Sequence, residues 1–181
     1  MHLEDLVPSP NDPKVLSFCE SICPGQQPFY VPVRPEPGSS PLMCFPNVEE
    51  KVRMSGGSLV HGWEISQMPK IYLEARFHAV WRSPAGEFAC MTKEELGQPR
   101  ILFLRDDTRK YTGTEVPRRR FSLAQDTALV EKYWSLLDES LALKESIASG
   151  GMRGDDPAVR GYLASLQSQR QRIQERLQNP A

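Results

Sequence analysis

The stretch from Ile71 to Trp81 constrains the fold more than any other part of the sequence. Large apolar side chains recur at alternate positions along it, Pro84-Ala85-Gly86 follows, and Glu87–Met91 alternates again. Alternation with a period of two is typical of a β-strand, and a Pro-x-Gly sequence favours a tight turn. We therefore predict an antiparallel hairpin in which the Glu87–Met91 strand lies beside the longer one.

Two further stretches with a period of two, His61–Ser66 and Ile101–Arg105, extend the predicted sheet. A helix is expected from about Pro46 to Met54, and Gly56-Gly57 ends it. The sequence thus predicts an α+β fold. Its parts are an antiparallel sheet, a helix on the N-terminal side of the sheet that carries Cys44, and a C-terminal antiparallel helical hairpin.

Three regions differ in composition. Residues 1–40 are rich in proline and predict a mostly extended leading segment with one short helix, capped by Asp12 and Pro13. Residues 41–121 form the predicted α+β core. Residues 122–181 carry apolar side chains at spacings of three and four, interrupted at Gly150-Gly151. We expect this hairpin to pack on itself and on the sheet; a surface for a protein partner or a homodimer is the alternative.

The net charge and the hydropathy of the chain limit the classes of partner that it is expected to bind. The 181 residues include 22 basic and 23 acidic ones, so the net charge of −1 provides no general attraction to nucleic acid or to an anionic membrane. No apolar run reaches 18 residues, and the N-terminus lacks the pattern of a secretory signal. The predicted location is the cytoplasm, with no membrane partner and with nucleic acid disfavoured.

The four cysteines, at positions 19, 23, 44 and 90, predict free thiols. Cys19 and Cys23 lack a second Cys or His pair at the spacing of a zinc site. A reducing cytoplasm disfavours disulfides. The sequence therefore predicts no metal and no cofactor.

Cys44 and His78 are the candidate nucleophile and base. Cys44 stands at the start of the predicted helix, where the helix dipole favours a thiolate. By alternation, His78 shares the polar face of its strand with Glu74 and Arg76, opposite the larger apolar side chains. An imidazole beside a thiol is the arrangement of nucleophilic catalysis. The alternative is a structural thiol, because Cys44 is flanked by apolar residues.

The order of a cysteine, a helix and then strands with a histidine resembles the papain-like cysteine hydrolases, including their cell-wall peptidase and transglutaminase-like branches. The resemblance covers residues 30–105, roughly. The strings Cys44-x-x-Asn47-Val48, Gly62-Trp63-x-Ile65 and Phe77-His78-Ala79-Val80-Trp81 are also similar to a group of uncharacterised bacterial proteins, which supplies no activity.

The papain-like resemblance implies that Cys44 is the nucleophile, that His78 is the base, and that a polar residue on or just after the Glu87–Met91 strand orients the imidazole. This strand offers Cys90 and Thr92 where Asp or Asn is usual. The orienting role therefore stays open. The other residues that could fill it are Glu64, Glu74 and Asn47.

Such an enzyme would hydrolyse or transfer an amide, thioester or isopeptide bond of a protein or peptide-like substrate. Gly62, Trp63 and Trp81 are the candidate substrate-binding residues; a strand bulge and core aromatic side chains are the alternative for them. The rival function is a non-enzymatic binding or adaptor protein that uses the helical hairpin.

Arg118, Arg119 and Arg120 form a third candidate site, because several adjacent cations can hold a phosphate or a nucleic-acid backbone. The alternative is a solvated connection whose arginines pair with nearby carboxylates. The nearby carboxylates belong to Asp106, Asp107 and Glu115.

Overall fold

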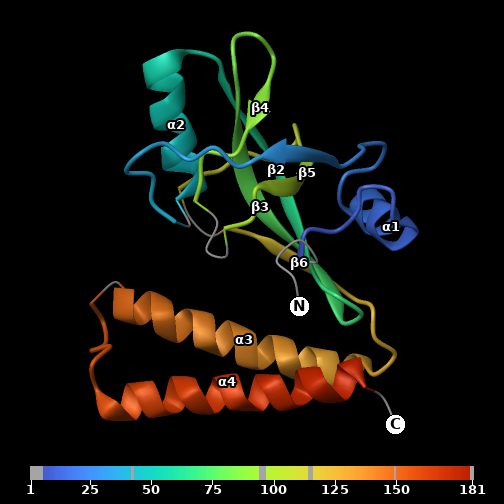
Figure 1. Cartoon of the computed structure of the whole chain (residues 1–181), viewed down its shortest axis with the longest axis vertical. Helices are drawn as coiled ribbons and strands as arrows, with labels where there is room; N and C mark the ends of the chain where they lie inside the picture. Colours follow the sequence, from blue (N-terminus) through green and yellow to red (C-terminus); the bar gives the residue numbers. More distant parts are fainter. Residues whose placement is uncertain (1–5, 42, 94–96, 114–115, 149, 180–181) are drawn as a thin grey trace. The chain divides into compact units, whose positions relative to one another are not determined.

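The computed structural model describes residues 6–41, 43–93, 97–113, 116–148 and 150–179, which form two compact units (Figure 1). The first unit comprises the residues up to 69 together with 73–121, and it contains two helices and most of the sheet. The second comprises residues 70–72 and 122 onwards, and it contains the helical hairpin. The predicted α+β class is confirmed.

The first helix, α1 (Pro13–Ile22), begins as its sequence predicts. The Asp12 carboxylate accepts hydrogen bonds from the backbone N–H groups of Lys14 and Val15, which the first helical turn would otherwise leave without partners. Val15, Phe18 and Cys19 form its buried face. The second helix, α2 (Cys44–Ser55), starts two residues earlier than predicted, so Cys44 is itself its first residue.

Six strands form one sheet. In chain order they are β1 (Phe29–Pro32), β2 (Ser58–Met68), β3 (Tyr72–Arg82), β4 (Phe88–Ala89), β5 (Arg100–Arg105) and β6 (Arg118–Ser122). The spatial order is β1-β5-β2-β3-β4, and β6 pairs with β3. The predicted turn joins β3 and β4, with the Gly86 N–H donating to the Ser83 carbonyl. In Figure 1, α1 lies to the right of this sheet and α2 to its left.

The sheet curls so that its two outer strands meet. The backbone N–H of Cys90, which directly follows β4, donates to the Pro32 carbonyl, and the Arg34 N–H donates to the Cys90 carbonyl. Five strands therefore form a closed ring. Side chains that point into the ring make one apolar cluster. Its buried members are Val31, Val60, Val80, Cys90, Ile101 and Phe103.

Two strands, β1 and β6, were not predicted. β1 lies among the prolines of the leading segment, and its last residue is Pro32. β6 contains the arginine triplet. Neither segment alternates apolar and polar side chains clearly, because their places in the sheet depend on pairing with β5 and β3. Long-range pairing of this kind leaves little trace in the local sequence.

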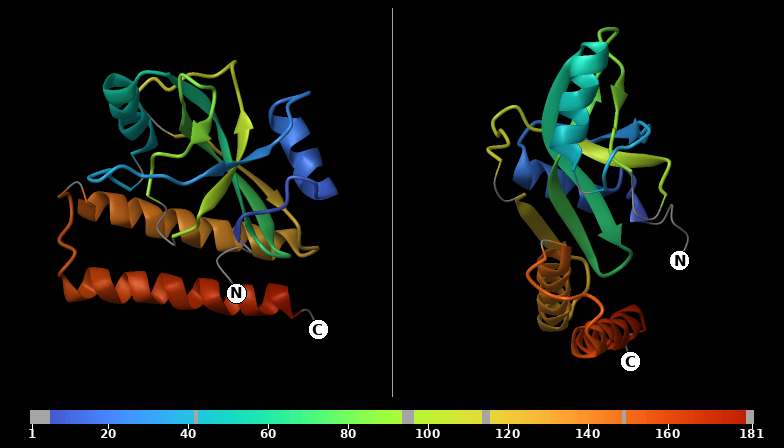
Figure 2. Two further views of the ribbon diagram at one scale, coloured as in Figure 1. Left: turned by 45° about the horizontal axis from the view of Figure 1, so that its top comes forward. Right: turned by 90° about the vertical axis from the view of Figure 1, so that its left-hand side faces the viewer.

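The hairpin consists of α3 (Thr127–Ala148) and α4 (Pro157–Gln178), which run side by side (Figure 2). Asp156 caps α4 by accepting the Ala158 N–H at 2.8 Å. Both helices carry buried apolar side chains. They are Val130, Tyr133, Leu166, Ile173 and Leu177. Within the described part of the chain, no helix has the length and apolar character needed to cross a bilayer.

Candidate functional site

The Cys44 sulfur lies at the edge of β3, next to the backbone of His78. The backbone N–H groups of Ala79 and Phe45 lie close enough to the sulfur to lower the pKa of the thiol. Ala79 directly follows His78 in β3, and the Phe45 N–H belongs to the first turn of α2. The start of α2 and the middle of β3 are therefore in contact, as a site that uses both residues requires.

A break in strand pairing makes room for this contact. Two residues before Ala79, the Phe77 N–H donates to the Pro117 carbonyl, just ahead of β6. Two residues after it, Trp81 pairs with Ala89 of β4. Ala79 therefore lies between the segments that pair with β3 on this edge, and a thiol can take the place of a strand carbonyl.

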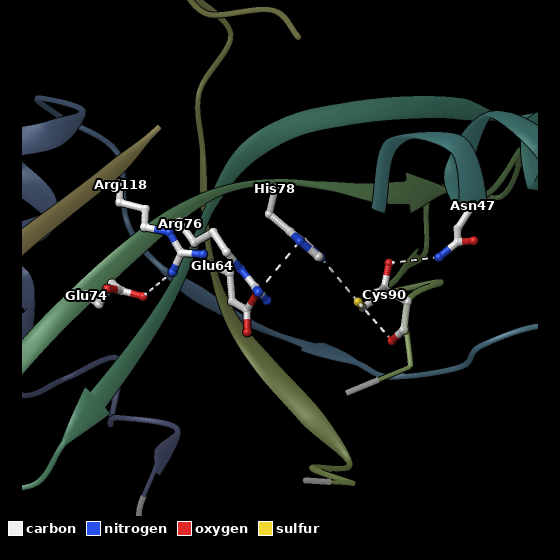
Figure 3. A network of polar contacts seen from close by, with 8 residues as sticks. Asn47, Glu64, Glu74, Arg76, His78, Cys90 and Arg118 are labelled. Atoms are coloured by element: carbon white, nitrogen blue, oxygen red, sulfur yellow. Dashed lines mark hydrogen bonds and ion pairs between the residues drawn. The ribbon is translucent and has the colours of Figure 1, made fainter. Parts of the chain in front are cut away.

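The His78 imidazole points to Cys90 and Glu64 (Figure 3). Its Nε2 atom lies 3.3 Å from the Cys90 sulfur, and its Nδ1 atom lies 3.7 Å from Glu64 Oε2. Glu64 also accepts a hydrogen bond of 2.6 Å from the Arg76 guanidinium. We call these four residues (Glu64, Arg76, His78 and Cys90) the His78 cluster. Alternation in β2 and β3 turns their side chains into the ring, next to its apolar core.

Burial controls the charges of the His78 cluster. His78 is only 1% exposed, and burial lowers its pKa to about 4, although Glu64 opposes the shift. The imidazole is therefore neutral at pH 7. Burial is the largest influence on the pKa of Glu64 and would raise it, but Arg76, His78 and Arg118 together outweigh burial, so the net shift is downward. The cluster thus holds a neutral imidazole beside a buried ion pair.

The hydrogen bonds of Cys90 indicate which imidazole nitrogen carries the proton. The Cys90 thiol donates to the Thr92 carbonyl, with 3.7 Å between sulfur and oxygen. A thiol has one proton, so with this donation the Cys90 sulfur accepts from Nε2–H of His78; the other tautomer, in which Cys90 donates to Nε2 and Nδ1–H faces Glu64, fits the same distances. We adopt the first tautomer, in which the Nδ1 atom is unprotonated. It lies beyond hydrogen-bond distance of Glu64, and it can accept a proton.

The Cys44 thiol is protonated at neutral pH. Burial raises its pKa and outweighs the opposing effect of the Ala79 N–H. The lowering expected from the helix N-terminus is therefore not the dominant effect in this structure. Among the residues that the structure describes, no group of three His, Cys, Asp or Glu side chains could hold a metal ion.

Asn47 and Glu74, two of the candidate orienting residues, have other partners. The Asn47 amide donates to the Ser40 carbonyl at 2.8 Å and to Thr92 Oγ1 at 3.3 Å, so it ties α2 to the segment that follows Cys90. Glu74 binds Arg118 at 2.9 Å and Arg120 at 2.6 Å. Of the orienting residues considered from the sequence, Cys90 and Glu64 are the ones that face the imidazole.

The three candidate substrate-binding residues lie apart from the His78 cluster. Trp63 points to the opposite face of β2 from Glu64, is buried, and donates its Nε1–H to Asp106 at 3.0 Å. Trp81 donates to the Gly56 carbonyl at 2.9 Å. A Cβ at Gly62 would lie 2.3 Å from the Leu104 carbonyl oxygen, so this glycine permits close packing of β2 on β5.

The arginine triplet divides between two environments. Arg118 and Arg120 bind Glu74, a partner that the sequence analysis did not consider for them, whereas Arg119 has no such ion pair among the described residues and lines a pocket to which Arg120 also contributes. Arg76 was also overlooked as a member of the site. Its position two residues before His78 was the available signal, because alternate residues of a strand share a face.

Comparison with protein-family models, with curated proteins and with solved structures finds no match to this chain. The papain-like resemblance therefore stays a prediction from the sequence.

Proposed function

We propose that the protein is a cysteine-dependent hydrolase or acyltransferase that acts on an amide, thioester or isopeptide bond, with Cys44 as nucleophile and His78 as base. The observation that carries the proposal is the position of the Cys44 thiol beside the Ala79 backbone, whose N–H lowers the pKa of the thiol against the effect of burial. This position places the thiol at the residue next to His78, whose Nδ1 can accept a proton.

The reaction follows from these groups. The proposed reaction requires the His78 imidazole, which faces Cys90 and Glu64 in this structure, to come within reach of the thiol. A nitrogen of His78 then takes the thiol proton as the Cys44 sulfur attacks the acyl carbon, and the carbonyl oxygen gains the negative charge. Backbone N–H groups in the first turn of α2 stabilise that oxygen. The imidazolium then protonates the leaving group, and a thioester to Cys44 forms. Water or a second acceptor attacks the thioester, while His78 again takes and returns the proton.

Cys90 is the competing nucleophile, because its sulfur is the one in contact with Nε2 at 3.3 Å. Two features favour Cys44. Cys90 is completely buried, whereas Cys44 retains 6% exposure, and Cys44 alone of the two begins a helix. In our proposal, Cys90 orients the imidazole through Nε2 and leaves Nδ1 for catalysis.

The test is site-resolved alkylation of the whole protein with iodoacetamide at pH 7–8, with each cysteine followed in its own tryptic peptide. Cys44 should be alkylated faster than Cys90. His78→Gln should slow the alkylation of Cys44 by about tenfold or more, because the loss of a general base usually costs at least that much. Because burial raises the pKa of Cys44, its reactivity should also climb steeply above pH 9.

An aryl thioester substrate then tests acyl transfer directly. Wild-type protein should form an acyl adduct on Cys44, Cys44→Ser should form no thioester, and Cys19→Ser serves as the matched control for loss of a buried thiol. An adduct on Cys90 would transfer the nucleophile role to that residue. If neither Cys44 nor Cys90 reacts in a folded protein, the His78 cluster has a structural role, and the adaptor function is favoured.

A further inference from the structure

A pocket of about 310 Å³ opens beside α1, on the face of the sheet unit away from the His78 cluster. Its walls combine three aromatic side chains with three arginines and two hydroxyl groups, and we call this site the arginine pocket. Phe18, Trp63, Phe121, Ser21 and Thr108 are among its residues. Arg120 also lines it but binds Glu74, which leaves two further arginines, Arg109 and Arg119. The volume of the pocket lies at the lower end of the range for small-molecule sites.

The two arginines are available to a ligand. Both side chains are exposed, and among the described residues neither Arg109 nor Arg119 forms an ion pair. The neighbouring arginines differ, because Arg118 and Arg120 bind Glu74. Two cations that converge on one pocket without carboxylate partners indicate an anionic ligand, and guanidinium groups bind phosphate through paired hydrogen bonds.

Asp106 is the one carboxylate among the described residues of the pocket, and its oxygens point to other groups. Oδ1 accepts hydrogen bonds from the backbone N–H and the hydroxyl of Thr108, and Oδ2 accepts from Trp63 Nε1. These bonds position the loop that carries Arg109. The Arg109 guanidinium in turn lies 5.7 Å from the centroid of the Trp63 ring, where a cation–π interaction holds it.

The aromatic wall offers a flat surface next to the cations. Phe121 is 47% exposed although it is a large apolar residue, and its ring centroid lies 6.0 Å from that of Phe18. An exposed ring of this kind stacks well on a planar heterocycle, and base stacking on an aromatic side chain adds appreciable affinity. Phe121 and Arg119 are two residues apart on β6, so their side chains emerge on the same face of the strand.

We propose that the arginine pocket binds a small phosphate monoester with a planar ring, of the class of the nucleoside monophosphates. Arg109 and Arg119 bind the phosphate group, and Phe121 stacks on the ring. This function is independent of Cys44 and His78 and is measured by binding alone.

The experiment is calorimetric titration of the full chain with adenosine monophosphate, adenosine and inorganic phosphate at low ionic strength. Adenosine monophosphate should bind at least about tenfold more tightly than either fragment, and its affinity should fall as salt is added. Inorganic phosphate binding equally well would overturn the role of the planar ring. Adenosine binding equally well would overturn phosphate recognition, and the absence of binding in the millimolar range would overturn the site.

Variants locate the binding. Arg119→Gln should weaken binding of adenosine monophosphate by about tenfold, as loss of a charged hydrogen-bond donor predicts. Phe121→Leu, which keeps an apolar side chain against Phe18, should weaken it severalfold. Arg53→Gln, at an exposed arginine outside the pocket, is the matched control and should bind as wild type does. Unchanged affinity in folded Arg119→Gln would place the ligand elsewhere and overturn the proposal.

Discussion

Polar side chains gather in two places in the sheet unit, and their charges are compensated differently. In the His78 cluster, the side chains are largely buried and each charged or polar group contacts another: Arg76 binds Glu64, and His78 lies between Glu64 and Cys90. In the arginine pocket, Arg109 and Arg119 are exposed and have no carboxylate partner among the residues that the structure describes. Charged groups that pair within the protein favour stability and fixed geometry, whereas unpaired charged groups in an open pocket are suited to bind a ligand.

The largest effect is expected when the carboxylate of the His78 cluster is removed. Glu64→Ala leaves Arg76 without its carboxylate in a largely buried position, and we expect it to lower the free energy of unfolding by about 3–5 kcal/mol. Denaturant titration monitored by circular dichroism measures the change. Glu50→Ala, which removes the exposed partner of Arg53, is the control and should leave the unfolding midpoint unchanged. Similar losses of unfolding free energy in Glu64→Ala and Glu50→Ala would contradict the prediction that the buried ion pair stabilises the protein more than the exposed one does.

The second prediction concerns pH. The pKa of His78 is about 4 in the folded protein and near 6.5 when unfolded, so the unfolded chain binds more protons between these values. Stability is therefore complete above pH 6.5 and declines as the pH falls towards 4, by up to about 3 kcal/mol for this residue. His78→Gln should remove that part of the decline. We would compare unfolding free energies of the two proteins at several pH values; parallel curves would refute the assignment.

The smallest effect compares two adjacent residues of β6. Arg120→Gln removes a partner of Glu74, both side chains being 12% exposed, and should lower the free energy of unfolding by about 1 kcal/mol. Arg119→Gln should leave it unchanged, because Arg119 has no carboxylate partner among the described residues. Thermal and denaturant unfolding of both variants sharpen the comparison; equal destabilisation would show that Arg119 also supports the fold.

Much of the fold could be predicted because local patterns report local structure. The alternation in β3, the turn before β4, the Asp-Pro starts of α1 and α4 and the glycines after α2 each act over a few residues. The alternation also placed His78 on one face with Glu74 and Arg76. It could not show that this face turns into a closed ring of strands, where a polar residue becomes buried.

The class of fold, the start of a helix at Cys44 or just after it, and the place of His78 on a strand follow from local sequence patterns. The partners of these residues depend on how the strands and helices pack together. Cys44 meets the Ala79 backbone because strand pairing on that edge of β3 is interrupted, and His78 meets Cys90 and Glu64 because the sheet closes. Arg118 and Arg119 differ because successive residues of a strand face opposite sides. These outcomes depend on contacts between distant segments, which local spacing does not encode.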